Sequence, residues 1–467
     1  SGAAMVDAFT DLSVPSFFVS GDLDVDGTAN LDVVDVDGTV NFAADVTFAD
    51  GADIITASAG DDNVRIGEGA GDSIASGGDD NVVIGKNAGT ALSTGQKNVA
   101  VGFEALQTED AHGDNVAIGY QALRVQNAGA DAFSTAVGYQ AGLSISTGVQ
   151  NSLFGAFAGD ALTTGQENTA LGLGALSTEA AGNYSVAVGR SALQKQVNST
   201  STDVYNVAVG YEAGQEITTG IQNTIVGGLA ADVLTEGNFN VAIGYAALTS
   251  DTLGSRSVAV GRSALEAQNL TTATDAYNVA VGMDAGSKIT TGVQNTLIGA
   301  LAGDALTDAD TNVAVGIGAL GSDVLGTAAV AIGSFALGSQ NFTTATTSYN
   351  VAVGQSAGGS VSTGVNNTFV GGLAGSSVTT GSFNVVTGFA AMDALTTGER
   401  NTVFGYGALG ADTLGSRNVA VGFGTLQNQN FTTATDSYNI AIGYDAGSSV
   451  TTGANNTLVG GLAGDAL

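Results

Sequence analysis

The chain has 467 residues, with 70 Gly, one Pro, one His and neither Cys nor Trp. The lack of Cys excludes disulfides and thiolate metal sites, and the absence of Gly at every third position excludes a collagen helix. The formal net charge of −33 argues against nucleic acid as a partner, because a polyphosphate would be repelled, and no apolar run is long enough to predict insertion into a membrane.

Residues 1–60 predict an acidic β shaft or connector that differs from the rest of the chain. Val-Asp-Gly-Thr at residues 25–28 returns at residues 36–39, and hydrophobic residues alternate with Asp around both copies. Asp-Gly turns between alternating segments are typical of short strands joined by tight turns. We therefore expect this segment to form a thin shaft that leads into a different structure at residue 61.

From residue 61 onward, one short phrase organises the sequence. Asn-Val-Ala-Val-Gly or a close variant returns 23 times between Asn63 and Gly460, and most of its closing glycines follow one another at the 17-residue step that joins Gly85 to Gly102. One 18-residue step, one 19-residue step and four 21-residue steps interrupt this period. Such a period predicts a solenoid, so residues 61–467 are expected to form an all-β parallel β-solenoid rod of 23 coils. An uncapped end would expose the core, so the rod is expected to continue beyond Leu467.

Each coil predicts a short strand followed by turns. The residues three before and one before the closing glycine are mostly β-branched or otherwise apolar, which indicates a strand with a buried face. The residue between them is Ala in about half of the coils and larger elsewhere, so both faces should be packed and the outer one should meet another chain. Thr-Thr-Gly and Ser-Thr-Gly tracts in the second half of many coils predict a turn and a second short strand.

Asn stands four residues before the closing glycine in 19 coils. Asn tolerates a bend in the backbone, and stacked side-chain amides can bond from one coil to the next. The sequence therefore predicts a structural ladder that includes Asn98, Asn115, Asn206, Asn278 and Asn350.

The four 21-residue coils each contain four extra residues, which cannot enter the strand register and should protrude from one edge of the rod. The first three coils of this kind follow one another at a 72-residue step, and the fourth comes after an 89-residue step. Protrusions about 19 Å apart along a solenoid suit multivalent weak contacts with surface glycans or another receptor. The candidate binding residues in these loops are Asn198, Asn269, Asn341, Phe342, Asn430, Phe431, Tyr205, Tyr277, Tyr349 and Tyr438.

Other kinds of site have less support in the sequence. Calcium could bind Asp61, Asp62, Asp79 and Asp80, which recur at an 18-residue step, although solvated, salt-screened turns explain these residues better. The remaining carboxylates are scattered and His112 is solitary, so we expect no catalytic group and no cofactor. Aromatic residues directly after the closing glycine should seal a seam between chains or, alternatively, stack on sugars: Phe103, Tyr120, Tyr139, Tyr211, Tyr245, Tyr406 and Tyr444.

The repeated phrase, with the Ala that follows it, resembles the YadA-like head of trimeric autotransporter adhesins over residues 63–467. This resemblance implies a homotrimer of left-handed parallel β-rolls. The 17-residue coils are longer than that family's usual repeat, and this sequence contains no obvious neck or membrane-anchor barrel. The Val-Asp-Gly-Thr shaft resembles tail-fibre-like structural proteins of marine bacteriophages, which use head-like repeats of the same kind.

Together the two resemblances imply an extracellular structural fibre and no enzyme. The favoured interpretation is a bacteriophage tail fibre that extends from the virion, contacts other fibre or tail subunits, and mediates or positions attachment to the host surface. The alternative is a bacterial cell-surface trimeric adhesin or extracellular filament subunit. In either case the rod is a spacer for a distal tip or itself binds the host.

Overall fold

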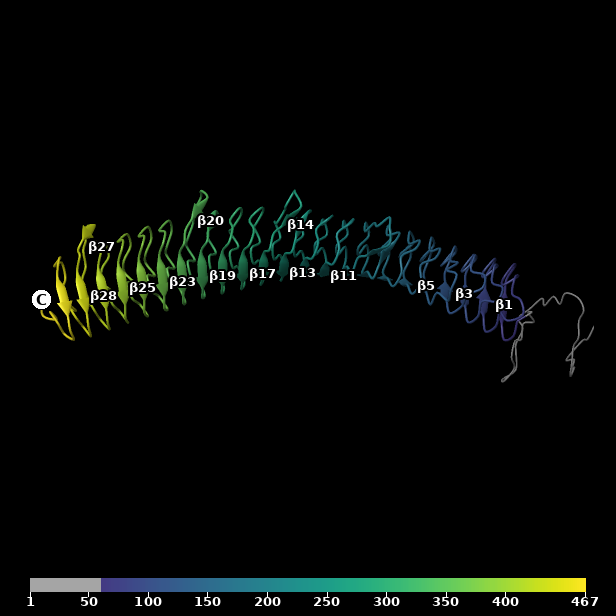
Figure 1. Cartoon of the computed structure of the whole chain (residues 1–467), viewed down its shortest axis with the longest axis horizontal. Helices are drawn as coiled ribbons and strands as arrows, with labels where there is room; N and C mark the ends of the chain where they lie inside the picture. The colour runs from purple at the N-terminus through teal and green to yellow at the C-terminus, as the bar shows by residue number, and fades with distance from the viewer. Residues whose placement is uncertain (1–59) are drawn as a thin grey trace, which may run out of the picture. The chain divides into compact units, whose positions relative to one another are not determined.

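The computed structural model describes residues 60–467, which stack into an elongated, gently curved rod (Figure 1). Three-residue strands, one from each coil, pair in chain order and form a 23-stranded parallel sheet. The predicted all-β parallel solenoid of 23 coils with a mostly 17-residue period is therefore confirmed. The strands predicted within residues 1–60 lie outside the described residues. In the described part, no helix has the length and apolar character needed to cross a bilayer.

Two sets of strands make up the fold. The long sheet contains β1 (Val64–Ile66), β2 (Val82–Ile84), β3 (Val99–Val101), β4 (Val116–Ile118), β5 (Thr135–Val137), β6 (Ser152–Phe154), β7 (Thr169–Leu171), β9 (Val186–Val188), β11 (Val207–Val209), β12 (Thr224–Val226), β13 (Val241–Ile243), β15 (Val258–Val260), β17 (Val279–Val281), β18 (Thr296–Ile298), β19 (Val313–Val315), β21 (Val330–Ile332), β23 (Val351–Val353), β24 (Thr368–Val370), β25 (Val385–Thr387), β26 (Thr402–Phe404), β28 (Val419–Val421), β30 (Ile440–Ile442) and β31 (Thr457–Val459). Four two-stranded parallel sheets pair β8 (Gly182–Asn183) with β10 (Thr202–Asp203), β14 (Gly254–Ser255) with β16 (Thr274–Asp275), β20 (Gly326–Thr327) with β22 (Thr346–Thr347), and β27 (Gly415–Ser416) with β29 (Thr435–Asp436).

The closing glycine sets how closely the coils approach one another. Gly102 has a φ of +136°, and a Cβ placed on it would overlap the carbonyl group of Gly119, the closing glycine of the next coil. A side chain at this position would therefore strain the backbone and also push two coils apart. Because the same contact recurs along the stack, the repeated phrase ends in Gly in every coil.

The Asn position links neighbouring coils through its side chain. Asn81 Nδ2 donates to the Gly95 carbonyl (2.9 Å), and Asn81 Oδ1 accepts the backbone N–H of Asn98 (2.9 Å). Asn98 in turn accepts the N–H of Asn115 (3.1 Å). The same bond, at 2.9 Å, joins three later pairs: Asn206 to Asn223, Asn278 to Asn295 and Asn350 to Asn367. These buried amides satisfy backbone groups at the bend that precedes each strand.

The interior of the rod is a narrow core of alternating large and small residues. The central residue of every long-sheet strand from β2 to β30 is buried. Where this residue is Ala259, the core space is filled by Leu265 of the same coil; both are fully buried. Where it is Leu297, glycines occupy the position equivalent to Leu265 on either side, because a Cβ on Gly286 or Gly303 would lie only 2.7 or 2.8 Å from the Leu297 methyl groups. Core volume is thus kept nearly constant from coil to coil.

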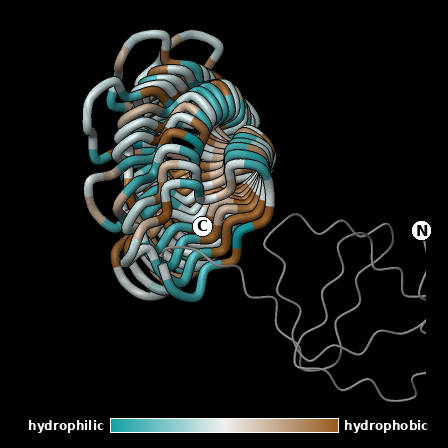
Figure 2. Tube along the Cα trace, turned by 90° about the vertical axis from the view of Figure 1, so that its right-hand side faces the viewer, coloured by the Kyte–Doolittle hydropathy of each residue, from teal (hydrophilic) through white to brown (hydrophobic). Residues whose placement is uncertain are grey.

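The two faces of each strand differ in a way that the apolar pattern alone did not show. The central residue of each strand points into the core. The Val, Ile, Leu or Phe residues on either side of it point outward and stay partly exposed; Leu171 is 49 % exposed and Phe404 is 41 % exposed. Viewed toward the end of the stack, hydrophobic residues gather in bands that run from coil to coil (Figure 2). One chain alone therefore leaves an apolar strip along its length.

The second strand predicted at the Thr-Thr-Gly and Ser-Thr-Gly tracts is wrong. These tracts are bends, and neighbouring N–H groups converge on one carbonyl of the next coil instead of forming a ladder. The backbone N–H groups of Ser146, Thr147 and Gly148 all bond the Thr163 carbonyl, at 2.9 to 3.2 Å. A chain that turns this sharply cannot present the alternating donors and acceptors of an extended strand.

Candidate functional site

The four 21-residue coils form the loops that project from one edge of the rod, seen near the labels β14, β20 and β27 in Figure 1. The second half of each loop returns as a two-residue strand that pairs with the coil before it, as Thr274–Asp275 pairs with Gly254–Ser255. Each loop therefore leaves the rod and then rejoins the preceding coil. This return makes it a defined projection.

A buried carboxylate fixes each loop to the coil beneath it. Asp251, fully buried, accepts the N–H of Gly254 (3.1 Å) in its own turn and the N–H of Leu270 (3.0 Å) in the loop. Its other oxygen accepts Gln268 Nε2, and Gln268 Oε1 accepts Asn278 Nδ2 (2.9 Å) of the amide ladder. A network in which every member is satisfied stabilises a buried charge and specifies one arrangement.

The same network recurs at the other three loops. The carboxylate is that of Glu179, Asp323 or Asp412, the amide that of Gln196, Gln340 or Gln429, and the loop N–H that of Asn198, Phe342 or Phe431. Sequence reasoning did not single out these carboxylates or amides. A signal was present, because each set repeats at the 72-residue and 89-residue steps of the loops.

The structure divides the predicted loop residues into buried and exposed groups. Asn198, Phe342 and Phe431 are 5 to 8 % exposed and face the coil below, where Asn198 Nδ2 donates to Glu179 Oε2 (2.8 Å). Available on the surface are Asn269, Asn341, Asn430, Tyr205, Tyr277, Tyr349 and Tyr438. The buried members hold the loop in place, so only the exposed members can contact a ligand directly.

Exposed aromatic and Arg side chains form two columns that run along the long sheet, one beside the beginnings of its strands and one beside their ends. The leading column consists of the residues directly before the Asn position, and the trailing column of those directly after the closing glycine. In the trailing column, Phe389, Tyr406, Phe423 and Tyr444 stack at centroid distances of 5.2 to 5.7 Å. Their faces cover one another, which leaves ring edges outward and disfavours sugar stacking on this run of rings.

The leading column combines rings with Arg. The Arg256 guanidinium lies between the Phe239 and Tyr277 rings, 4.8 and 5.9 Å from their centroids, and its Nε contacts Asp275 Oδ2 at 3.0 Å. Because Asp275 and Tyr277 belong to the projecting coil, this cluster ties the outer part of the loop to the coil before it. The exposed Tyr277 is thus held in a fixed orientation.

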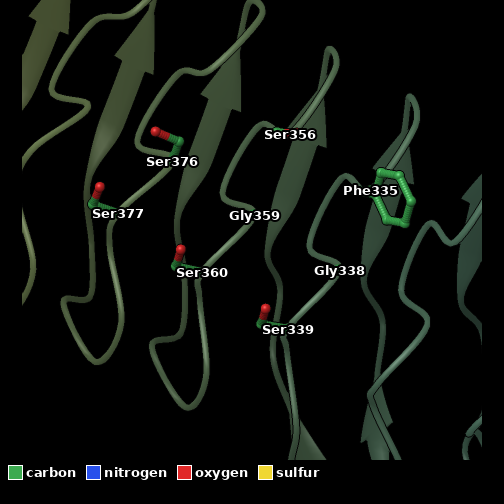
Figure 3. A pocket seen from close by; sticks show the side chains of 8 residues that line it. All are labelled: Phe335, Gly338, Ser339, Ser356, Gly359, Ser360, Ser376 and Ser377. Atoms are coloured by element: carbon green, nitrogen blue, oxygen red, sulfur yellow. The ribbon is translucent and has the colours of Figure 1, made fainter.

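Shallow hollows recur beside the trailing column. One, of about 410 Å³, is lined by Phe335 and by Ser and Gly residues from successive coils (Figure 3). Two others, of about 310 and 420 Å³, occupy the equivalent positions near Tyr406 and Phe157. The hollow near Phe157 contains Asp160, whose Oδ1 is buried without a hydrogen-bond partner. These hollows offer hydroxyl and carboxylate groups to a polar ligand, but no pair of groups set for acid–base chemistry.

Asp160 belongs to a set of four half-buried carboxylates at one position of the repeat. Burial raises the pKa of each carboxyl above its ordinary value, because the charged form loses hydration. The set consists of Asp160, Asp232, Asp304 and Asp393. The steps between successive members equal those between the projecting loops.

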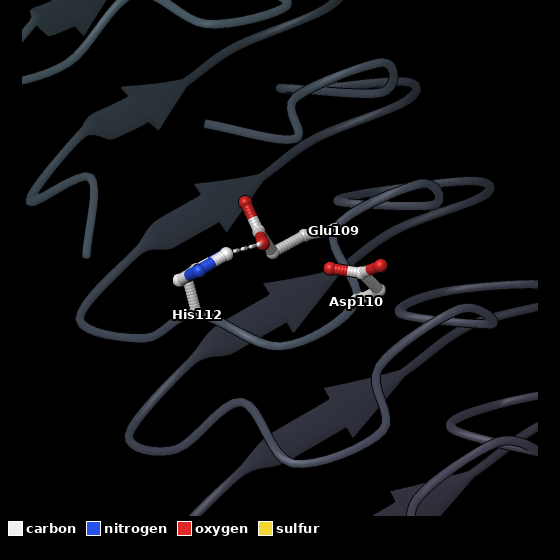
Figure 4. Close-up of side chains that lie close together, drawn as sticks. All are labelled: Glu109, Asp110 and His112. Carbon is white, nitrogen blue, oxygen red and sulfur yellow. Dashed lines mark hydrogen bonds and ion pairs between the residues drawn. The ribbon is translucent and has the colours of Figure 1, made fainter. Parts of the chain in front are cut away.

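In residues 60–467, one group brings three metal-ligating atoms within 4.8 Å of one another: Glu109, Asp110 and His112 (Figure 4). Glu109 is buried, its Oε1 lies 3.3 Å from His112 Nδ1, and burial raises the pKa of its carboxyl. Glu109 and His112 therefore already contact each other, and exposed acidic groups such as Asp110 are common without an ion. Among the four aspartates predicted as a weak calcium site, Asp79 Oδ1 accepts the N–H of Asp61 (2.9 Å), while Asp62 and Asp80 are exposed.

Comparison with known proteins assigns the chain to no family. No protein-family model matches the chain, and a search of curated protein sequences finds no match.

Replacing the buried loop anchor should loosen one loop and leave the rod folded. Asp251→Ala leaves the N–H groups of Gly254 and Leu270 without their carboxylate acceptor and removes one of the two acceptors of Gln268 Nε2, at a cost of roughly 1–3 kcal/mol for such buried groups. Amide exchange in residues 269–276 should accelerate on the order of tenfold, as measured by hydrogen exchange with mass spectrometry. Thr271→Ala, an exposed change in the same loop, is the control; equal exchange in both variants would contradict the anchoring role.

Stability should rise as the pH falls from 7 toward 4. The pKa of Asp160, Asp232, Asp304 and Asp393 is raised by burial. The resulting stabilisation is fully present below the unfolded value of about 4 and is lost as the pH rises through the folded values. The measurement is the melting temperature of the rod as a function of pH.

A matched pair of variants separates this effect from the loss of net negative charge. Substituting Asn for the four half-buried Asp residues should flatten the dependence of the melting temperature on pH. Substituting Asn or Gln for four exposed acidic residues should flatten it less; these residues are Asp62, Asp80, Glu236 and Glu266. Equal flattening in the two variants would assign the pH dependence to net charge alone.

Proposed function

We propose that this chain is the rod of a homotrimeric extracellular fibre. The observation that carries the proposal is the outward face of the long sheet, where the residue before the closing glycine is Val, Ile, Leu or Phe in every coil except at Thr387. Several of these side chains are 37 to 51 % exposed in the single chain, among them Ile66, Ile243 and Ile298. A soluble protein that leaves so long an apolar strip open is expected to cover it with another chain.

The size of this strip supports association of several chains. Strands about 4.8 Å apart give a strip on the order of 110 Å long, and about 10 Å of width gives roughly 1,000 Å² per chain. That area exceeds the roughly 800 Å² per partner of a standard interface. Three chains with their outward faces turned to a common axis bury the strip completely. The resemblance of the repeated phrase to YadA-like heads supports the same number of chains and a left-handed coil.

We further propose that the fibre is a bacteriophage tail fibre that attaches the virion to its host. The resemblance of the shaft to tail-fibre-like proteins supports this assignment, and the anchored loops supply repeated projections. Exposed Asn and Tyr side chains on the loops offer amide, hydroxyl and ring groups suited to surface glycans. The alternative, a bacterial cell-surface adhesin or filament subunit, would use the same rod. An antibody against residues 61–467 would label virion tails in the first case and cell surfaces in the second.

The proposed trimer predicts the mass of the protein in solution. Light scattering should give three times the chain mass of 45.7 kDa. Ile243→Asp places a carboxylate at the centre of the proposed interface and should lower this mass toward that of one chain, because a buried unpaired charge is strongly unfavourable. Glu236→Gln, at an exposed turn nearby, should leave the trimer intact. A monomeric mass for the unaltered protein would overturn the proposed assembly.

Shortening the rod separates a binding rod from a spacer. Deleting residues 228–299 removes one complete block of the longer repeat and keeps the coils in register, while deleting residues 271–274 shortens one loop to the ordinary coil length and removes Thr274 of β16 with it. If the loops bind the host, both variants should bind susceptible cells less tightly, as measured by retention of the fluorescent fibre on washed cells. Unchanged retention in both would contradict host binding by the loops and leave the rod as a spacer.

A further inference from the structure

The leading and trailing columns match in side-chain size in 16 of the 23 coils. Gly or Ala occupies the trailing position in five coils, and each of these coils has Gln or Asn in the leading position, as in Gln222 with Gly228. In the 11 coils whose leading residue is aromatic or Arg, the trailing residue is large, as in Phe239 with Tyr245. The two columns therefore vary together along the rod.

Contacts within one chain do not account for this match. The three strand residues and two bends separate the columns, and in residues 60–467 no ring–ring or Arg–ring contact joins one column to the other; these contacts run from one coil to a neighbouring one at the same edge. The chain has room for a side chain at Gly228, whereas a Cβ on Gly372 would lie 3.3 Å from the Phe389 ring. A Cβ placed on Gly228 would meet no atom closer than 3.8 Å, and the φ of Gly228 is not in the left-handed range. What keeps this position small lies outside the chain.

We propose that the leading column of one chain packs against the trailing column of the next at each of the three corners of the fibre. This inference rests on the proposed trimer. A three-fold cyclic assembly makes heterologous contacts, so one side of a strand face meets the opposite side of its neighbour's face. At the level of one coil, Phe239 then faces the partner's Tyr245.

The pairing assigns a specific chemistry to several coils of the corner. Phe239 is 40 % exposed and Tyr245 is 59 % exposed in one chain, and together they form an aromatic pair that covers both rings. At another level, Arg400 meets the partner's Tyr406 as a cation–π pair. At the level of Gln222, the partner's Gly228 leaves space for the amide. Matching of sizes in these 16 coils also favours a single axial register of the chains.

The absence of Cys from the chain allows a direct test. The double variant Phe239→Cys/Tyr245→Cys, treated with a short bismaleimide, should give a covalent trimer on a denaturing gel. The single variants should stay monomeric on the gel, and so should Phe239→Cys/Tyr406→Cys, whose thiols lie many coils apart. Cross-linking of the single variants, or none in the double variant while light scattering still reports a trimer, would overturn the pairing but not the trimer. A monomer in light scattering would overturn the proposed assembly itself.

Exchanging the sizes of the side chains at positions 222 and 228 provides an independent test of the pairing. Gly228→Phe should lower the melting temperature of the trimer, because the new ring meets the partner's Gln222. Adding Gln222→Ala, which shortens the side chain but keeps a non-Gly residue at the positive φ of this position, should restore at least half of the loss. Without such a restoration, the two positions do not meet and the pairing is wrong.

Discussion

The fold depends on the close contact of backbones at the closing glycine. Only a residue without a side chain lets one coil lie directly against the next there, and the strands, the amide ladder and the core then follow in register. The contact also has a cost, because the position before the Asn and the position two after the glycine have positive φ even where the residue is Tyr277 or Phe335. Such conformations are individually unfavourable, so each coil is stable chiefly through its neighbours.

So short a coil cannot bury both faces of its strand. Its interior accepts the central residue, and the coils with Leu297 show how little space remains, since the neighbouring positions become Gly286 and Gly303. The larger β-branched side chains are consequently directed outward. An apolar outer face is therefore a direct result of the narrow core, and the proposed association with further chains would cover what one chain cannot enclose.

The sequence predicted the features that repeat in every coil. The closing glycine, the Asn position and the strand were recognised because one residue type serves one local geometry. The loop anchors were not recognised, since Asp251 and Gln268 belong to successive coils and meet only after the coils stack. For the same reason Phe342, which looked like a projecting ligand-binding residue, is buried against the preceding coil. The prediction of a strand at the Thr-Thr-Gly tracts was wrong because Thr favours strands in general. The propensity of a residue does not reveal that several N–H groups of the tract bond one carbonyl of the next coil.

The loop anchors bear directly on whether the rod can bind a surface at several points. Multivalent binding needs sites held at a spacing that the target can match, and a flexible four-residue insertion would not hold such a spacing. Asp251 and its equivalents fix the base of each loop to the coil below, and Arg256 fixes the outer part around Tyr277. Tyr277 and Tyr438, each over an Arg of the preceding coil, are therefore held in place on the rod. A pure spacer needs stiffness between its ends but has no need for a buried charge beneath each projection, and this additional structure favours a role for the loops in attachment.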